Sequence, residues 1–246
     1  MIGRGGAISA KMEAQVGQRR NEGWLQPLER PALLWMAAHM PPRVTPDQLT
    51  VLGLVGSAIV FTGYVLSSHD PGFLWLANFG LFVNWVGDSM DGTLARYRKI
   101  ERPKYGFFLD HTTDLLTEVM FALGLGLSSF VRFEIACLAL IVYLLMAAFI
   151  FLRAQVSGLM QITISGIGPT EVRVGMVILN IAMFVVPPKP VLTLWAPVSL
   201  VDLAVLAAAA VGFVLFLVAI RREARRLASM DPTPPSGNAG IGKTSR

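Results

Sequence analysis

Four aspartates stand in or beside apolar segments, where a charged side chain is costly. Asp88 and Asp91 follow one apolar run, and Asp110 and Asp114 lie near the start of the next. A charged residue at the centre of a membrane helix costs about 2.5–3.5 kcal/mol on insertion scales, so it normally faces a polar cavity and serves a function. Residues three or four positions apart share one helix face. Each pair therefore presents two carboxylates to one side, and antiparallel neighbouring helices would bring all four together.

A cluster of four carboxylates predicts a bound metal. The acids repel one another in a low-dielectric site unless a positive charge lies among them. Carboxylate oxygens are hard ligands that bind Mg²⁺, Mn²⁺ or Ca²⁺. Mg²⁺ usually takes a few carboxylates and completes its shell with water and substrate phosphates. We therefore expect a Mg²⁺ or Mn²⁺ site that acts on a nucleotide diphosphate, with these ligands: Asp88, Asp91, Asp110 and Asp114.

Two other roles for the acids compete with this interpretation. They could pair with Arg96 and Arg98 to hold helices together, although such pairing does not need four acids. A cation or proton transporter also places acids within its spans. A transporter would not require the small residues beside them, since Gly92 and Ala95 leave room for a ligand close to the backbone.

The motif Asp88-x2-Asp91-Gly92-x2-Ala95-Arg96-x9-Gly106-x3-Asp110-x3-Asp114 closely resembles the signature of the CDP-alcohol phosphotransferase family. The motif spans residues 88–114, and the layout of apolar segments extends the resemblance over about residues 24–226. By this resemblance, aspartates 88, 91 and 110 hold the metals, and the fourth is also near them and acts as general base. The residues implied in CDP binding are Gly92, Ala95, Arg96, Gly106 and Thr50. Asp47 stands where the family commonly has an asparagine.

The acceptor alcohol is left open by two groups of residues. Arg153 and Arg173 are placed like cationic residues that bind an acceptor phosphate in phosphatidylinositol-phosphate synthases, although both also serve as topology markers. In contrast, Asp110-His111 and Gly168-Pro169-Thr170-Glu171 resemble the choline and ethanolamine phosphotransferases, and His111 is a third candidate for acceptor binding. The leading hypothesis is transfer of a phosphatidyl group from CDP-diacylglycerol to a small hydroxylated acceptor with release of CMP. The alternative is transfer of a phosphoalcohol from a CDP-aminoalcohol to diacylglycerol or a related lipid.

Composition predicts an all-α integral membrane protein. The chain has 246 residues, of which 54% are hydrophobic and 15% charged. Runs of about 20 apolar residues suffice to cross a bilayer, and six are expected, at 49–68, 73–95, 107–130, 133–152, 172–187 and 195–220. Before them, Trp24, Leu28 and Trp35 lie among charged residues, which is typical of an amphipathic helix in the membrane interface. The expected regions are a cytosolic segment (1–48), a catalytic transmembrane domain (49–226) and a disordered cytosolic tail (227–246).

The placement of positive charge predicts the orientation. All 21 Lys and Arg residues except Arg132 and Lys189 fall in the termini or in the loops after the second and fourth spans. By the positive-inside rule, both termini and the aspartates face the cytosol. The net charge of +5 is therefore explained by topology and anionic lipid headgroups rather than by nucleic acid. No removable signal peptide is expected.

Two further expectations concern the apolar spans. Small residues four apart, Gly53 with Ser57 and Ala122 with Gly126, permit close helix packing, and the family resemblance implies a homodimer. The single cysteine, Cys137, rules out an intramolecular disulfide and a thiolate metal cluster.

Overall fold

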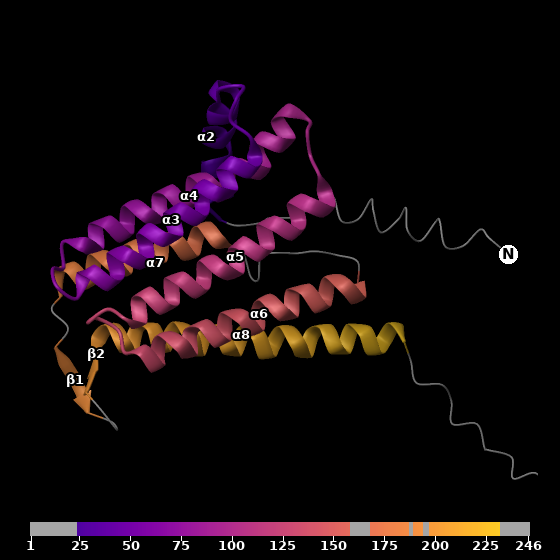
Figure 1. Cartoon of the computed structure of the whole chain (residues 1–246). Coiled ribbons are helices and arrows are strands. Elements are labelled where there is room, and N and C mark those ends of the chain that lie inside the picture. Colours follow the sequence, from indigo (N-terminus) through magenta and orange to yellow (C-terminus); the bar gives the residue numbers. More distant parts are fainter. Residues whose placement is uncertain (1–23, 158–167, 187–188, 194–196, 232–246) are drawn as a thin grey trace, which may run out of the picture.

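The computed structural model describes residues 24–157, 168–186, 189–193 and 197–231, and it is almost entirely helical (Figure 1). The all-α prediction is confirmed, with one addition, a two-stranded antiparallel hairpin between the last two helices. The elements in chain order are α2 (Gln26–His39), α3 (Pro46–Ser67), α4 (Phe73–Arg98), α5 (Pro103–Gly126), α6 (Phe133–Ser157), α7 (Pro169–Val185), β1 (Pro190–Thr193), β2 (Pro197–Ser199) and α8 (Leu200–Met230).

Helices α3 to α8 occupy the six predicted spans with shifted ends. Proline sets three of the helix starts, because Pro46, Pro103 and Pro169 stand in the first turn, where no backbone N–H is needed. Helix α8 starts later than expected because residues 197–199 form β2. It also continues to Met230, ten residues beyond the predicted end of the span at residue 220. Residues 1–23 and 232–246 of the predicted terminal segments lie outside the described residues.

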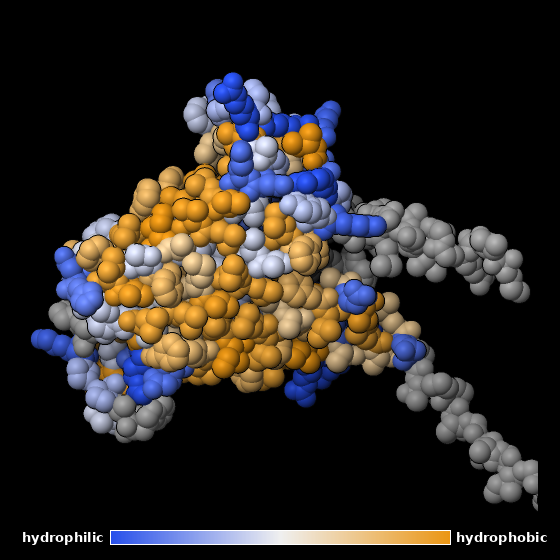
Figure 2. Space-filling view, in the orientation of Figure 1, coloured by the Kyte–Doolittle hydropathy of each residue, from blue (hydrophilic) through white to orange (hydrophobic). Residues whose placement is uncertain are grey.

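The surface fits a membrane protein. Among the described residues, α3, α6 and α8 are long and apolar enough to cross a bilayer. Helices α4 and α5 carry the aspartates, and α7 has 17 residues. In Figure 2 apolar side chains cover the middle of the visible face, and hydrophilic side chains gather toward the ends. An exposed apolar surface of this extent is unusual for a soluble monomer.

Helices α3 and α4 pack through glycine at nearly backbone contact. A Cβ atom at Gly56 would lie 2.3 Å from the Asn84 nitrogen, and one at Gly87 would lie 2.2 Å from the Gly53 nitrogen. The prediction that Gly53 and Ser57 allow close helix packing is therefore confirmed, and the packing partner is α4 of the same chain. Ser57 is fully buried, so this face is not available to a second copy.

Helix α2 lies across the end of the bundle that carries the aspartates, here called the aspartate end (Figure 1). Its Leu33 and Ala37 join a buried cluster with Leu49, Met90 and Leu94, next to the first aspartate pair. Its outer side chains stay exposed, including Leu28 and Trp35. A helix is present at this position, and its amphipathic character and its place in the membrane interface stay predictions.

Candidate active site

Three of the four aspartates meet at the aspartate end. Carboxylate oxygens of Asp88 on α4 and of Asp110 and Asp114 on α5 all lie within 4.8 Å of one another. The prediction that α4 and α5 are direct neighbours is wrong, because α5 packs against α3 and α6 instead of along α4. Helix α3 packs against both acid-bearing helices and so sets their relative position. The space between the acids forms a small cleft lined by Thr50, Gly53, Leu54, Asn84, Asp88, Asp91, Thr113, Asp114 and Thr117.

Asp91 lines the same cleft and is turned toward α3. Its Oδ2 accepts a hydrogen bond of 2.7 Å from the hydroxyl of Thr50, and its Oδ1 accepts from the backbone N–H of Gly92. The side chain is buried. Thr50, expected to line a nucleotide pocket, thus orients a predicted metal ligand. The sequence predicts one cluster of four acids, whereas the structure has a cluster of three with a fourth acid beside it.

Arg173 reaches the aspartates from α7. Its Nη2 lies 2.7 Å from Asp88 Oδ2, and its Nε donates a 2.7 Å hydrogen bond to Asn84 Oδ1. The sequence pattern predicts Arg173 at the acceptor and gives no role to Asn84. The available signal was spacing, because Asn84 is a polar residue in an apolar run one helical turn before Asp88.

Glu118 is a further acid that the sequence analysis overlooked. It follows Asp114 by one turn of α5 and lies close enough to Arg173 and Asp88 to interact electrostatically. The same i, i+4 spacing places it on the aspartate face of α5. Glu118 is thus a fifth acidic side chain close to the aspartates, although it does not line the cleft itself.

Four of the five residues predicted to bind CDP lie along the last turns of α4 and the first turn of α5, and the fifth, Thr50, lies on α3. Arg96 is exposed, and its Nη2 donates to Thr93 Oγ1 at 3.3 Å. A Cβ atom at Gly92 would lie 3.1 Å from Arg96 Nη1, so glycine leaves room for this side chain. A Cβ atom at Gly106 would meet nothing within 4 Å. Ala95 is partly exposed on the same stretch, and the space near these residues is open to a ligand.

Asp47 ties the α4–α5 connection to the start of α3. Its carboxylate forms an ion pair with Arg102 and accepts a hydrogen bond from the hydroxyl of Tyr105 at 3.4 Å. The hydrogen bond with Asp47 raises the pKa of the Arg102 guanidinium above its ordinary value. The acid at this position, where an asparagine is common in the family, thus has a structural partner in this chain.

The other two predicted acceptor residues are engaged by the protein. Arg153 on α6 places its Nε 3.1 Å from a carboxylate oxygen of Glu223 on α8. His111 stacks on Phe107 with ring centroids 4.3 Å apart, and its Nδ1 lies 3.2 Å from Asp110 Oδ2. Both contacts are compatible with structural roles, so acceptor binding by Arg153, Arg173 and His111 stays a prediction.

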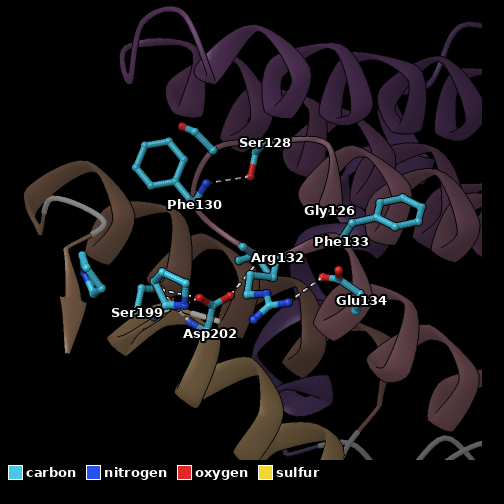
Figure 3. A pocket seen from close by; sticks show the side chains of 12 residues that line it. Gly126, Ser128, Phe130, Arg132, Phe133, Glu134, Ser199 and Asp202 are labelled. Carbon is cyan, nitrogen blue, oxygen red and sulfur yellow. Dashed lines mark hydrogen bonds and ion pairs between the residues drawn. The ribbon is translucent and has the colours of Figure 1, made fainter. Parts of the chain in front are cut away.

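A larger pocket of about 410 Å³ lies away from the aspartates, where the α5–α6 connection meets β2 and the start of α8 (Figure 3). Its polar groups largely bond to one another. The backbone N–H of Arg132 donates to Asp202 at 2.8 Å, and the Arg132 guanidinium lies 3.4 Å from Glu134. Asp202 also caps α8 through Ser199. This pocket therefore lies at a helix junction, and the clustered acids remain the candidate active site.

Comparison with known proteins agrees with this geometry. The family model described as CDP-alcohol phosphatidyltransferase matches residues 43–214, which include the cleft and all four aspartates. The chain belongs to the CDP-alcohol phosphatidyltransferase family. This confirms the resemblance read from the motif.

Two curated relatives differ in the reaction that their names describe. An archaetidylinositol phosphate synthase of Pyrococcus horikoshii is 33% identical over 99 residues, which are 40% of this chain and 49% of the relative. A cholinephosphotransferase 1 of Danio rerio is 31% identical over 96 residues, which are 37% of this chain and 25% of the relative. The chain thus matches about half of one relative and a quarter of the other, and membership of the family leaves the substrates open.

Proposed function

We propose that the protein is a Mg²⁺- or Mn²⁺-dependent phospholipid synthase that transfers a phosphatidyl group from CDP-diacylglycerol to a small hydroxylated acceptor and releases CMP. The observation that carries this proposal is the convergence of Asp88, Asp110 and Asp114 within 4.8 Å, at the family's motif positions. Carboxylate oxygens at this separation suit a hard divalent cation. A bound metal would hold the pyrophosphate and offset the negative charge of the departing CMP.

The protein's own groups supply positioning and proton transfer. Asp114 accepts the proton of the acceptor hydroxyl, and the resulting alkoxide oxygen forms a bond to the β-phosphorus. The bond from that phosphorus to the bridging oxygen breaks, and CMP leaves with the electron pair. Thr50 keeps Asp91 turned into the cleft, while Arg96 and the open space at Gly106 receive the nucleotide.

The aminoalcohol reaction is the second candidate. The similarity to a cholinephosphotransferase and the Gly168-Pro169-Thr170-Glu171 stretch favour it. In addition, Arg153 and Arg173 are each paired with an acid of the protein, so binding of an acceptor phosphate by these arginines requires other donors or a rearrangement.

The proposed setting is a membrane with six spans, both termini and the cleft on the cytosolic side, and two copies of the chain. The distribution of lysine and arginine supports this orientation. The helices α3, α6 and α8 support membrane insertion. The homodimer rests on family resemblance, and the face of Gly53 and Ser57 is already used within the chain.

One assay separates the two reactions. Purified protein in detergent with Mg²⁺ is given CDP-diacylglycerol, CDP-choline or CDP-ethanolamine, each against inositol phosphate, glycerol phosphate, free small alcohols and diacylglycerol, and CMP is measured. We expect CMP only with CDP-diacylglycerol and a small acceptor, and no CMP in excess EDTA until Mg²⁺ or Mn²⁺ is restored. Release from a CDP-aminoalcohol with diacylglycerol would establish the second candidate, and full turnover in excess chelator would contradict metal dependence.

A further inference from the structure

Arg173 is held in place on two sides. Its guanidinium binds Asp88 through Nη2 and Asn84 through Nε, both at 2.7 Å, and only 10% of its side chain is exposed. Asn84 is fixed in turn, because its Nδ2 donates to Ser57 Oγ at 3.1 Å. Ser57 also shares a 2.8 Å hydrogen bond with Thr117 on α5. A buried polar chain thus runs from α7 through α4 and α3 to the helix that carries Asp110 and Asp114.

Through Asp88, Arg173 lies beside a group of negatively charged side chains. The carboxylates of Asp88, Asp110 and Asp114 lie within 4.8 Å of one another, and Glu118 adds another acid nearby. Repulsion between charges at this separation is strong wherever water is scarce. A paired arginine at this position reduces that repulsion, and removing one partner of such a pair leaves an uncompensated charge.

We propose that Arg173 is a positioning residue that orients Asp88 and supplies the positive charge that keeps the aspartate cluster assembled before metal binds. This inference rests on the metal site of the proposed function. It assigns Arg173 to the metal side of the cleft instead of the acceptor side. Arg173 and the metal then stabilise the same cluster, so the loss of one increases the stabilisation that the other provides.

The test is thermal unfolding in detergent with excess EDTA or with saturating Mg²⁺. Arg173→Gln removes the charge and keeps an amide donor, Arg173→Lys keeps the charge, and Arg98→Gln is the matched control. Arg98 also reaches across helices, with its guanidinium on the backbone carbonyls of Met40 and Pro41. We expect Arg173→Gln to lower Tm by roughly 5–15 °C in EDTA and much less in Mg²⁺. Arg173→Lys should lower Tm in EDTA less than Arg173→Gln does, because lysine keeps the charge but cannot bond Asp88 and Asn84 together. Arg98→Gln should lower Tm equally in both conditions.

Each other outcome has a defined meaning. An equal loss of Tm for Arg173→Gln in EDTA and in Mg²⁺ would overturn the inference, and so would a protein that stays unfolded at saturating Mg²⁺. A variant that folds only when purified with Mg²⁺ supports it. Failure of the proposed function is distinguished by the wild type, which would then show neither CMP release nor a rise in Tm with Mg²⁺ or Mn²⁺.

Discussion

At the scale of single residues, the proposed function gives Asp114 and Asp91 different roles, the first as proton acceptor and the second as metal ligand. Asp114 belongs to the group of three carboxylates, whereas Asp91 is tied to Thr50 and Gly92. Asp114→Asn keeps shape and removes basicity, so CMP release should fall by about 10²–10⁴-fold while metal-dependent CDP binding persists. Single-turnover rates of CMP release and CDP affinity, both measured on Asp114→Asn, test this prediction. Near-normal turnover would contradict the base assignment, and complete loss of CDP binding would make Asp114 a metal ligand.

Asp91 and Thr50 should act together on binding. Asp91→Asn removes a negative charge from the proposed metal site, so metal and CDP binding should weaken in parallel. Hydrogen bonds to charged groups contribute about 1.5–3 kcal/mol, and the bond from Thr50 to Asp91 is 2.7 Å. Thr50→Val should therefore weaken CDP binding by about tenfold or more. Combining both changes should add little to Asp91→Asn alone, and independent, additive losses would show that Thr50 acts on the nucleotide directly.

At the scale of elements, the contact between α3 and α4 positions the acids. A Cβ atom at Gly87 would lie 2.2 Å from the Gly53 nitrogen and 2.6 Å from the Leu49 carbonyl oxygen, and backbone atoms cannot move aside as a side chain can. Gly87→Ala must push the helices apart beside Asp88. We expect a loss of stability at or above the roughly 1–3 kcal/mol typical of overpacking, together with loss of activity.

Gly175→Ala on α7 is the matched control for this prediction. A Cβ atom there would meet nothing within 4 Å, so alanine should leave stability unchanged or raise it by up to about 1 kcal/mol. Thermal unfolding in detergent and CMP release are the measurements. Equal effects of the two substitutions would show that the close approach of α3 and α4 is not required.

At the scale of the whole molecule, the distribution of positive charge predicts which end of the bundle faces the cytosol. In a Cys137→Ala background, Lys99→Cys and Lys189→Cys place single thiols at two exposed positions. An impermeant thiol reagent should label Lys189→Cys in intact cells and Lys99→Cys only in inside-out vesicles. The reverse pattern would contradict the proposed orientation, and labelling of both positions from one side would contradict the six-span arrangement.

The sequence by itself determined the four motif aspartates and the six apolar helical segments. Hydrophobic length and proline at helix starts act locally, so the six segments and the aspartate pairs at 88 with 91 and 110 with 114 follow from spacing. The convergence of Asp88 with Asp110 and Asp114 also follows the pattern, although the helices do not pack as that pattern suggested.

Only the tertiary structure decided how the acids are partnered. Arg173 is 85 positions from Asp88 in the chain and Thr50 is 41 positions from Asp91, so no local periodicity connects them. The close packing of α3 against α4 depends on Gly53, Gly56 and Gly87, each of which fits against backbone of the other helix. Such fits depend on shape in three dimensions, and it is the packing of α7 against α4 that brings Arg173 to Asp88.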